Sequence, residues 1–238
     1  MMQQLRRPAG LVGIVLFVGL VLALAGVRKT DAVPGAPKPF EVAKVTFEQN
    51  ATDGDFEVVF EAKGGSDGLM KFKVVAPDGR TVVDIAAHDT STLGPCQIRF
   101  ESPELKNGRR LRAAYPQGEY VFSGTTTSGA MLQSRTSLAH PLPATAAFVS
   151  PVAGAKGVAM RGTVITWKAV PGVAAYMVYV EQEELDVSVT AKLPASATSF
   201  TIPDGFLLPG TEYMMGIGTV TKAGNGSYGE ATFTTAAK

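Results

Sequence analysis

The amino-acid sequence predicts an all-β protein, built as two β-sandwich domains in tandem after an N-terminal signal segment. Glycine and proline are frequent, at 26 and 15 of 238 residues, which suits a chain with many tight turns. Apolar and polar residues alternate with a period of two along much of the chain after residue 26, whereas helical periodicity is scarce. Pro141 and Pro143 separate two such blocks, because proline interrupts backbone pairing and stiffens an extended segment.

The first 25 residues have the pattern of an export signal. Two arginines, Arg6 and Arg7, precede an uncharged apolar run from Leu11 to Ala25, which ends in a small-x-small cleavage pattern. The run is about 15 residues long, shorter than the ~20 that a membrane-spanning helix needs. We therefore predict a signal peptide over residues 1–25, with cleavage after Ala25 or Ala32 and an uncleaved N-terminal anchor as the alternative.

Residues 26–39 are predicted to be a flexible, proline-containing linker that buries no core. Residues 40–140 then carry the first set of alternating segments, among them Phe56 to Glu61 and Met70 to Val74. Turn signals such as Pro77-Asp78-Gly79 recur every 8–12 residues, as in a sandwich of about seven short strands. We predict an immunoglobulin-like sandwich here. No motif fixes its family, and Gly118 to Phe122 is the nearest to a signature.

In the second block, strands are predicted from apolar residues that share a face. These residues are Ile165 and Trp167, then Tyr176, Val178 and Val180, then Tyr213, Met215 and Ile217. A turn at Leu208-Pro209-Gly210-Thr211 precedes Tyr213, with proline presetting φ and glycine free to take positive φ. A tyrosine in this place can bury its ring and return its hydroxyl to the turn backbone, as in a tyrosine corner.

This block resembles the fibronectin type III family. The matching stretches are Thr166 to Gly172, Tyr176 to Val180, Phe200 to Pro203, Leu208 to Tyr213, Gly224 to Ser227, and Phe233 to Thr235. Their order and spacing fit strands B, C, E and F, the F–G loop and strand G, over residues 146–236. The resemblance implies a seven-strand Greek-key sandwich with a binding or spacer role and no catalysis.

The inventory of reactive residues predicts no catalytic, metal or cofactor site. Cys96 shares a face with Ile98 and Phe100, which predicts a small buried residue rather than a reactive thiol. His88 and His140 are predicted loop residues without metal-ligand spacing.

Other charged and polar groups have structural explanations. The acidic residues Asp53, Asp55, Asp78 and Asp89 are not predicted to bind calcium, because their spacing fits no calcium loop. Asp53-Gly54 and Asp78-Gly79 are interpreted as turns. The basic stretch from Lys106 to Arg112 is predicted to be a solvated connection. Asn50 and Asn225 each begin an N-glycosylation pattern, which matters only in a host that glycosylates.

One surface is predicted to contact a partner. If the shared apolar faces point inward, then Met177, Tyr179 and Met214 point outward on neighbouring strands, beside Gly216 and Gly218. Such a patch beside bare backbone is a candidate contact surface. The alternative is that the first domain or a neighbouring strand residue covers it.

The sequence therefore predicts a non-catalytic, exported binding, adhesion or spacer protein, secreted or periplasmic, with a protein or glycan partner. The net charge of +1 gives no reason to expect nucleic acid. A membrane is expected only if the N-terminal segment stays uncleaved. The alternatives are an accessory or weak hydrolase with its site on the first domain, and a structural subunit of a cell-envelope assembly.

Overall fold

The computed structural model describes residues 35–87, 89 and 93–238. The predicted signal peptide, most of the predicted linker and His88 lie outside these residues. In the described part of the chain, no helix is both long and apolar enough to cross a membrane.

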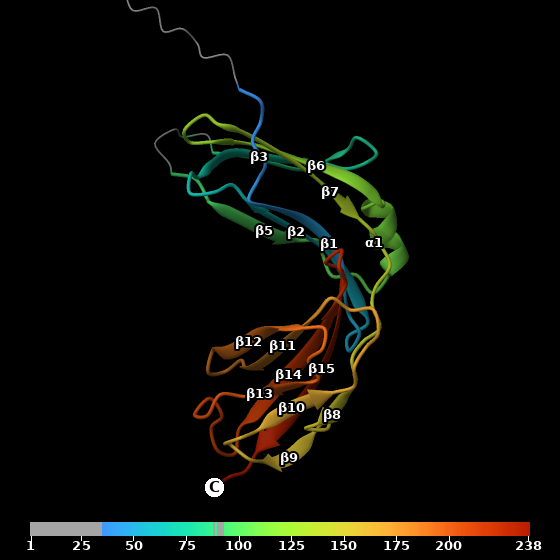
Figure 1. Ribbon diagram of the computed structural model, residues 1–238, viewed down its shortest axis with the longest axis vertical. Coiled ribbons are helices and arrows are strands. Elements are labelled where there is room, and N and C mark those ends of the chain that lie inside the picture. The colour runs from blue at the N-terminus through green and yellow to red at the C-terminus, as the bar shows by residue number, and fades with distance from the viewer. Residues whose placement is uncertain (1–34, 88, 90–92) are drawn as a thin grey trace, which may run out of the picture. The chain divides into compact units, whose positions relative to one another are not determined.

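The chain is all-β, as predicted, and forms two sandwiches in tandem (Figure 1). The first sandwich contains β1 (Val42–Asn50), β2 (Asp55–Lys63), β3 (Leu69–Val75), β4 (Thr81–Ala86), β5 (Gln97–Glu101), α1 (Gly108–Ala114), β6 (Gly118–Thr126) and β7 (Met131–Leu138). The second contains β8 (Phe148–Ser150), β9 (Ala155–Val158), β10 (Val164–Trp167), β11 (Ala175–Gln182), β12 (Val187–Pro194), β13 (Ser199–Thr201), β14 (Glu212–Val220) and β15 (Gly226–Thr235).

Both sandwiches follow the same strand order. The first has the sheets β1-β2-β5 and β4-β3-β6-β7, and the second has β8-β10-β13 and β12-β11-β14-β15, with the short β9 added beside β15. In strand letters, each sandwich therefore pairs A-B-E with C′-C-F-G, which is the fibronectin type III arrangement. The resemblance stated for the second block is confirmed, and the first sandwich has this same order.

Each sandwich has its own hydrophobic cluster. The residues predicted to point inward in the second sandwich are buried, and Ile165, Tyr176, Val178, Val180, Tyr213, Met215 and Ile217 have no exposed surface. The Tyr213 hydroxyl accepts a hydrogen bond from the Leu208 amide at 2.9 Å and lies 3.3 Å from the Phe206 carbonyl oxygen. The predicted tyrosine corner is thus confirmed. The first sandwich has a counterpart, since the Tyr120 hydroxyl donates to the Pro116 carbonyl at 3.1 Å.

The stretch from Lys106 to Arg112 contains a short helix, so the prediction of a simple solvated connection was wrong. The Asn107 side chain accepts hydrogen bonds from the amides of Arg109 and Arg110 and caps the N-terminus of α1. Leu111 is 1% exposed and anchors the helix to the first core. The Arg112 guanidinium lies 4.9 Å from the centroid of the Phe47 ring. A helix of seven residues is too short to produce a clear 3.6-residue period.

Cys96 is exposed, so the prediction of a buried cysteine was also wrong. It precedes β5 and lies outside the strand, whereas Ile98 and Phe100 within the strand pack against the first core. The alternation was correct but extended one residue beyond the strand end. Lys38, near the end of the predicted linker, pairs with Leu132 of β7. Phe40, the first residue of the predicted domain, is buried.

Candidate ligand-binding cleft

The two sandwiches share one sheet, because β1 pairs in parallel with the beginning of β15. Glu48 lies opposite Gly226, and Asn50 lies opposite Tyr228. The outer face of β1-β2-β5 therefore continues directly into the outer face of β15-β14-β11-β12. We call this continuous surface the joined face. It includes the outward residues predicted on β11 and β14.

A buried asparagine holds this junction together. Asn225 is 2% exposed. Its side-chain oxygen accepts a hydrogen bond from the Phe47 amide at 3.0 Å. Its side-chain nitrogen donates to the carbonyls of Ala139 and Pro141 at 2.8 and 2.9 Å. One side chain thus satisfies three backbone groups, from β1 and from the connection between the sandwiches.

Both hydrogens of the Asn225 side-chain amide are donated to backbone carbonyls, and the side chain has almost no exposure in this fold. The glycosylation pattern at Asn225 is therefore inaccessible in the folded protein. Next to it, the Ser227 hydroxyl donates to the Pro143 carbonyl at 2.7 Å and accepts from the Gln49 side chain at 2.9 Å. These contacts add to the polar junction.

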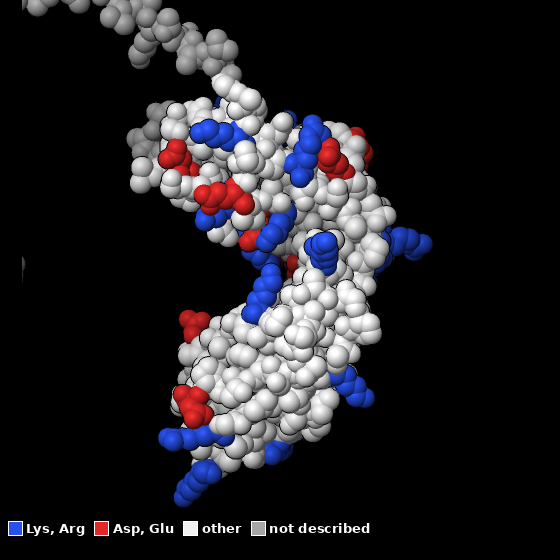
Figure 2. Space-filling view, viewed as in Figure 1, with Lys and Arg blue, Asp and Glu red and all other residues white. Residues whose placement is uncertain are grey.

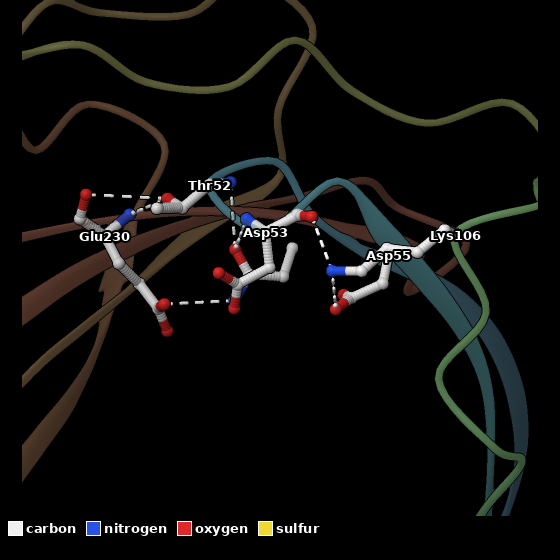
Figure 3. A network of polar contacts seen from close by, with 6 residues as sticks. Thr52, Asp53, Asp55, Lys106 and Glu230 are labelled. Carbon is white, nitrogen blue, oxygen red and sulfur yellow. Dashed lines mark hydrogen bonds and ion pairs between the residues drawn. The ribbon is translucent and has the colours of Figure 1, made fainter.

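A second polar network joins the turn between β1 and β2 to β15 and to Lys106, two residues before α1 (Figure 3). The Glu230 amide donates to the Thr52 hydroxyl at 2.7 Å, and its carboxylate accepts from the Asn50 side chain at 3.0 Å. On the other side of the turn, the Lys106 ammonium lies 3.3 Å from the Asp55 carboxylate. Asp53 lies in the turn, as predicted, and its carboxylate accepts a hydrogen bond from the Asn50 side chain. Asp55 is the first residue of β2.

A cleft of about 600 Å³ lies over the joined face, within the usual size range of ligand pockets. The first sandwich contributes Lys44, Thr46, Glu48, Val59, Glu61 and Arg99 to its lining. The second contributes, among others, Ala174, Met177, Lys192, Lys222, Ala223 and Tyr228. In Figure 2, Lys and Arg side chains gather beside the hollow between the two sandwiches.

The Lys and Arg side chains on the two walls of the cleft differ in whether they have an acidic ion-pair partner. On the first sandwich, Lys44 lies 3.3 Å from Glu61, and Arg99 is paired with Glu101. On the second sandwich, Lys192 and Lys222 are exposed, and neither has an acidic partner within ion-pair distance in the described part of the chain. The wall formed by the second sandwich therefore offers two uncompensated positive charges.

Glu48 and Glu57 lie directly opposite each other on β1 and β2. Burial raises the pKa of the Glu48 carboxyl, although the Thr46 hydroxyl donates to it at 2.8 Å. Burial and then the neighbouring Glu48 carboxylate raise the pKa of Glu57 to about 7. Burial, and then the Glu48 carboxylate across the junction, raise the pKa of the Tyr228 phenol above its usual range.

The raised pKa of Glu57 predicts a pH-dependent stability. Between its usual pKa of 4.5 and about 7, the folded chain binds more protons than the unfolded chain. The free energy of unfolding should therefore fall as pH rises through this window. We expect Glu57→Gln to reduce this fall and to be more stable than the wild type at pH 8 by about 1 kcal/mol, after allowance for solvent screening.

Urea unfolding at several pH values measures this effect. Glu183→Gln is the matched control, because it removes one negative charge from an exposed turn of the second sandwich. Identical pH slopes for the wild type and the Glu57 variant would contradict the prediction.

The surface predicted to contact a partner has its residues on one outer face, but its two glycines are covered by tyrosine rings. Its residues do share the outer face, but Gly216 and Gly218 do not leave bare backbone. A Cβ at Gly216 would overlap the Tyr179 ring, and one at Gly218 would overlap the Tyr228 ring. Tyrosine rings thus cover the glycines, which is how aromatic side chains protect glycine backbone in sheets. The alternative of cover by a neighbouring strand residue holds for both glycines.

The remaining predicted contact residues lie in different places. Met177 lines the cleft, whereas Met214 lies beside a separate hollow near Glu181 and Glu212. The Tyr179 hydroxyl donates to the Glu230 carboxylate. Whether this surface binds a partner stays a prediction.

Sequence reasoning missed most of the cleft. Glu48, Arg99, Lys192, Lys222 and Tyr228 were not predicted as site residues. The alternation Lys44-x-Thr46-x-Glu48 indicates a polar outer face on β1. Nothing local, however, indicates that this face meets the second sandwich. His140 does lie in a loop, and its ring contacts Phe47, with its Nε2 2.8 Å from the Tyr115 carbonyl oxygen.

Comparisons with known proteins found no matching family model and no matching curated protein. Many solved structures are similar, among them three fibronectin type III structures of low sequence identity. The chicken CNTN1 FN1-FN3 domains are 12% identical with a TM-score of 0.34, and the match covers 85% of this chain and 66% of that one. Fibronectin(III)-like modules of Clostridium thermocellum CbhA are 10% identical, with a TM-score of 0.35 and coverage of 82% and 91%.

A two-domain fibronectin type III segment of chicken tenascin is 14% identical, with a TM-score of 0.32 and coverage of 81% and 99%. At these TM-scores, the fold assignment rests on the strand order and the tyrosine corners of the chain itself. The chain thus has the fibronectin type III fold in both sandwiches.

Proposed function

We propose that this chain is a non-catalytic, exported binding protein that holds its ligand in the cleft over the joined face. The proposal rests on the parallel pairing of β1 with β15, which joins the sheets of the two sandwiches. The pairing of β1 with β15 places a polar sheet face and a face with Met177 around one cavity of about 600 Å³. The buried contacts of Asn225 support a fixed arrangement of the two walls, and a preformed site loses less entropy on binding.

Export is supported by the pattern of residues 1–25. The chain would then act in the periplasm or outside the cell. An uncleaved N-terminal segment would tether the same cleft to the membrane surface.

Filling the cleft tests the proposed function without knowledge of the ligand. Ala174 and Ala223 are exposed residues of its lining. We expect the pair Ala174→Trp and Ala223→Trp to reduce retention of the purified protein on washed envelope of its host at least about tenfold, which is ~1.4 kcal/mol of binding. The retained fraction is measured by sedimentation.

The control is Ala169→Trp, because Ala169 is exposed in the same sandwich and lies outside the cleft. Circular dichroism and urea unfolding confirm that the variants are folded. Equal retention of the cleft-filling pair, the control and the wild type would contradict the proposal.

One observation favours the predicted hydrolase alternative. Glu57, with a pKa raised to about 7, lies opposite a second carboxyl group at the edge of the cleft, and such pairs serve as acid and base in glycosidases. Release of reducing ends from a polysaccharide by the wild type and not by Glu57→Gln would support this alternative.

A further inference from the structure

We infer that the ligand of the cleft is an anionic polysaccharide with uronic-acid residues, bound with one sugar ring against Tyr228 and its carboxylates at Lys192 and Lys222. This inference rests on the proposed function and adds the chemical class of the ligand. Three features of the cleft carry it, and they come from different strands.

The first feature is the position of the Tyr228 ring. Opposite edges of the ring lie over two glycines. A Cβ at Gly226 would lie 2.8 Å from Tyr228 Cε2, and a Cβ at Gly218 would overlap the Cε1 side. The ring therefore lies down along the sheet rather than standing out from it. Because Tyr228 also lines the cleft, it gives a flat apolar surface of the kind on which a sugar ring packs.

The second feature is the unequal charge of the walls. Lys192 and Lys222 have no ion-pair partner in the described part of the chain and line the cleft on the same side. Lys44 and Arg99 oppose them from the first sandwich, each already paired with an acid. Carboxylates of a ligand would be complementary to the unpaired lysines.

The third feature distinguishes a polysaccharide from an acidic peptide. Glu48 lines the cleft next to Tyr228 and is an acceptor when ionised. Sugar hydroxyls can donate to it, whereas the side chains of an acidic peptide bring only further carboxylates. In addition, β1 and β15 are each paired on both edges where they meet beside Tyr228, at Glu48–Asn50 and Gly226–Tyr228. An extended peptide therefore finds no free strand edge next to the Tyr228 ring.

The test measures binding of three soluble polymers to the full-length protein purified from its host: polygalacturonate, neutral dextran and poly-L-glutamate. Affinity electrophoresis gives the retardation of the protein by each polymer. We expect binding of polygalacturonate, with at least about tenfold weaker binding after Lys192→Glu plus Lys222→Glu. Raising the salt concentration should weaken the wild-type interaction.

The matched control is Lys156→Glu plus Lys168→Glu, which changes the net charge equally on exposed positions of the second sandwich outside the cleft. We expect it to bind as the wild type does. Tyr228→Ala should also weaken binding, and Tyr228→Phe, which keeps the ring, should weaken it less.

Each outcome has a defined meaning. Preference for poly-L-glutamate over polygalacturonate would overturn the inference in favour of an acidic protein. Equal losses in the cleft and control lysine pairs would show nonspecific attraction and would also overturn it. If no polymer binds while cleft filling still abolishes retention on the envelope, the ligand class is wrong and the proposed function stands.

Discussion

Replacing Asn225 by alanine is expected to lower the free energy of unfolding by about 3 kcal/mol, because three buried or half-buried backbone groups lose their partner. These groups are the Phe47 amide and the carbonyls of Ala139 and Pro141. The cost is large because Asn225 is 2% exposed and water has little access to replace it. Urea unfolding measures the loss.

Asn225→Asp separates the roles of the two amide atoms. A carboxylate can still accept from the Phe47 amide, but it faces two carbonyl oxygens without a proton to donate. This arrangement raises the pKa of the new carboxyl, so the variant should recover part of its stability as pH falls and the group becomes protonated. Asn225→Ala should show no such recovery.

Gln133→Ala is the control, because Gln133 is exposed on β7 and should change stability by less than about 0.5 kcal/mol. Hydrogen exchange gives a local readout. The Phe47 amide should lose protection in Asn225→Ala before the amides of β14 do. A loss of stability no greater than that of the control would show that the junction does not depend on Asn225.

Gly216→Ala is expected to cost about 2 kcal/mol, because one added methyl group overlaps the Tyr179 ring. The φ angle of Gly216 is not positive, so the backbone itself would accept alanine. The ring must therefore move, and its hydroxyl must leave the Glu230 carboxylate. Stability is lost because the Tyr179 ring no longer covers the Gly216 backbone and its hydroxyl no longer hydrogen-bonds to Glu230.

A double-mutant cycle checks this explanation. With Tyr179→Ala already present, Gly216→Ala should cost nothing or stabilise, because alanine is better than glycine inside a strand by about 0.5–1 kcal/mol. The coupling free energy should thus exceed about 1 kcal/mol. Additive effects would show that another contact makes the glycine necessary.

Much of each sandwich could be predicted from the sequence. The inward faces of β11 and β14 follow from alternation, since a strand with one apolar side has only one way to bury it. Tyr213 and its turn predict a tyrosine corner. The same signal exists in the first sandwich, where Pro116-Gln117-Gly118-Glu119-Tyr120 parallels Pro209-Gly210-Thr211-Glu212-Tyr213. That parallel could have identified the first sandwich as a second copy of the same fold.

One sequence prediction failed where an alternating pattern of apolar residues continued past the end of a strand. The alternation through Cys96 says nothing about where β5 begins, so an exposed cysteine was expected to be buried. The glycines at 216 and 218 predict a gap in the side chains of β14. They do not predict which neighbouring ring fills it, because the direction of Tyr179 and Tyr228 depends on packing across strands.

The all-β class, the inward faces and the tyrosine corner follow from the sequence, because they depend on residues a few positions apart. The cleft, in contrast, depends on the tertiary structure. The contact that creates it joins Phe47 to Asn225, separated by 178 positions. No local pattern encodes such a pairing, because the outer face of β1 reads as an ordinary polar surface until β15 lies beside it. The walls of the site are thus set by the junction between two sandwiches and by the buried asparagine that links them.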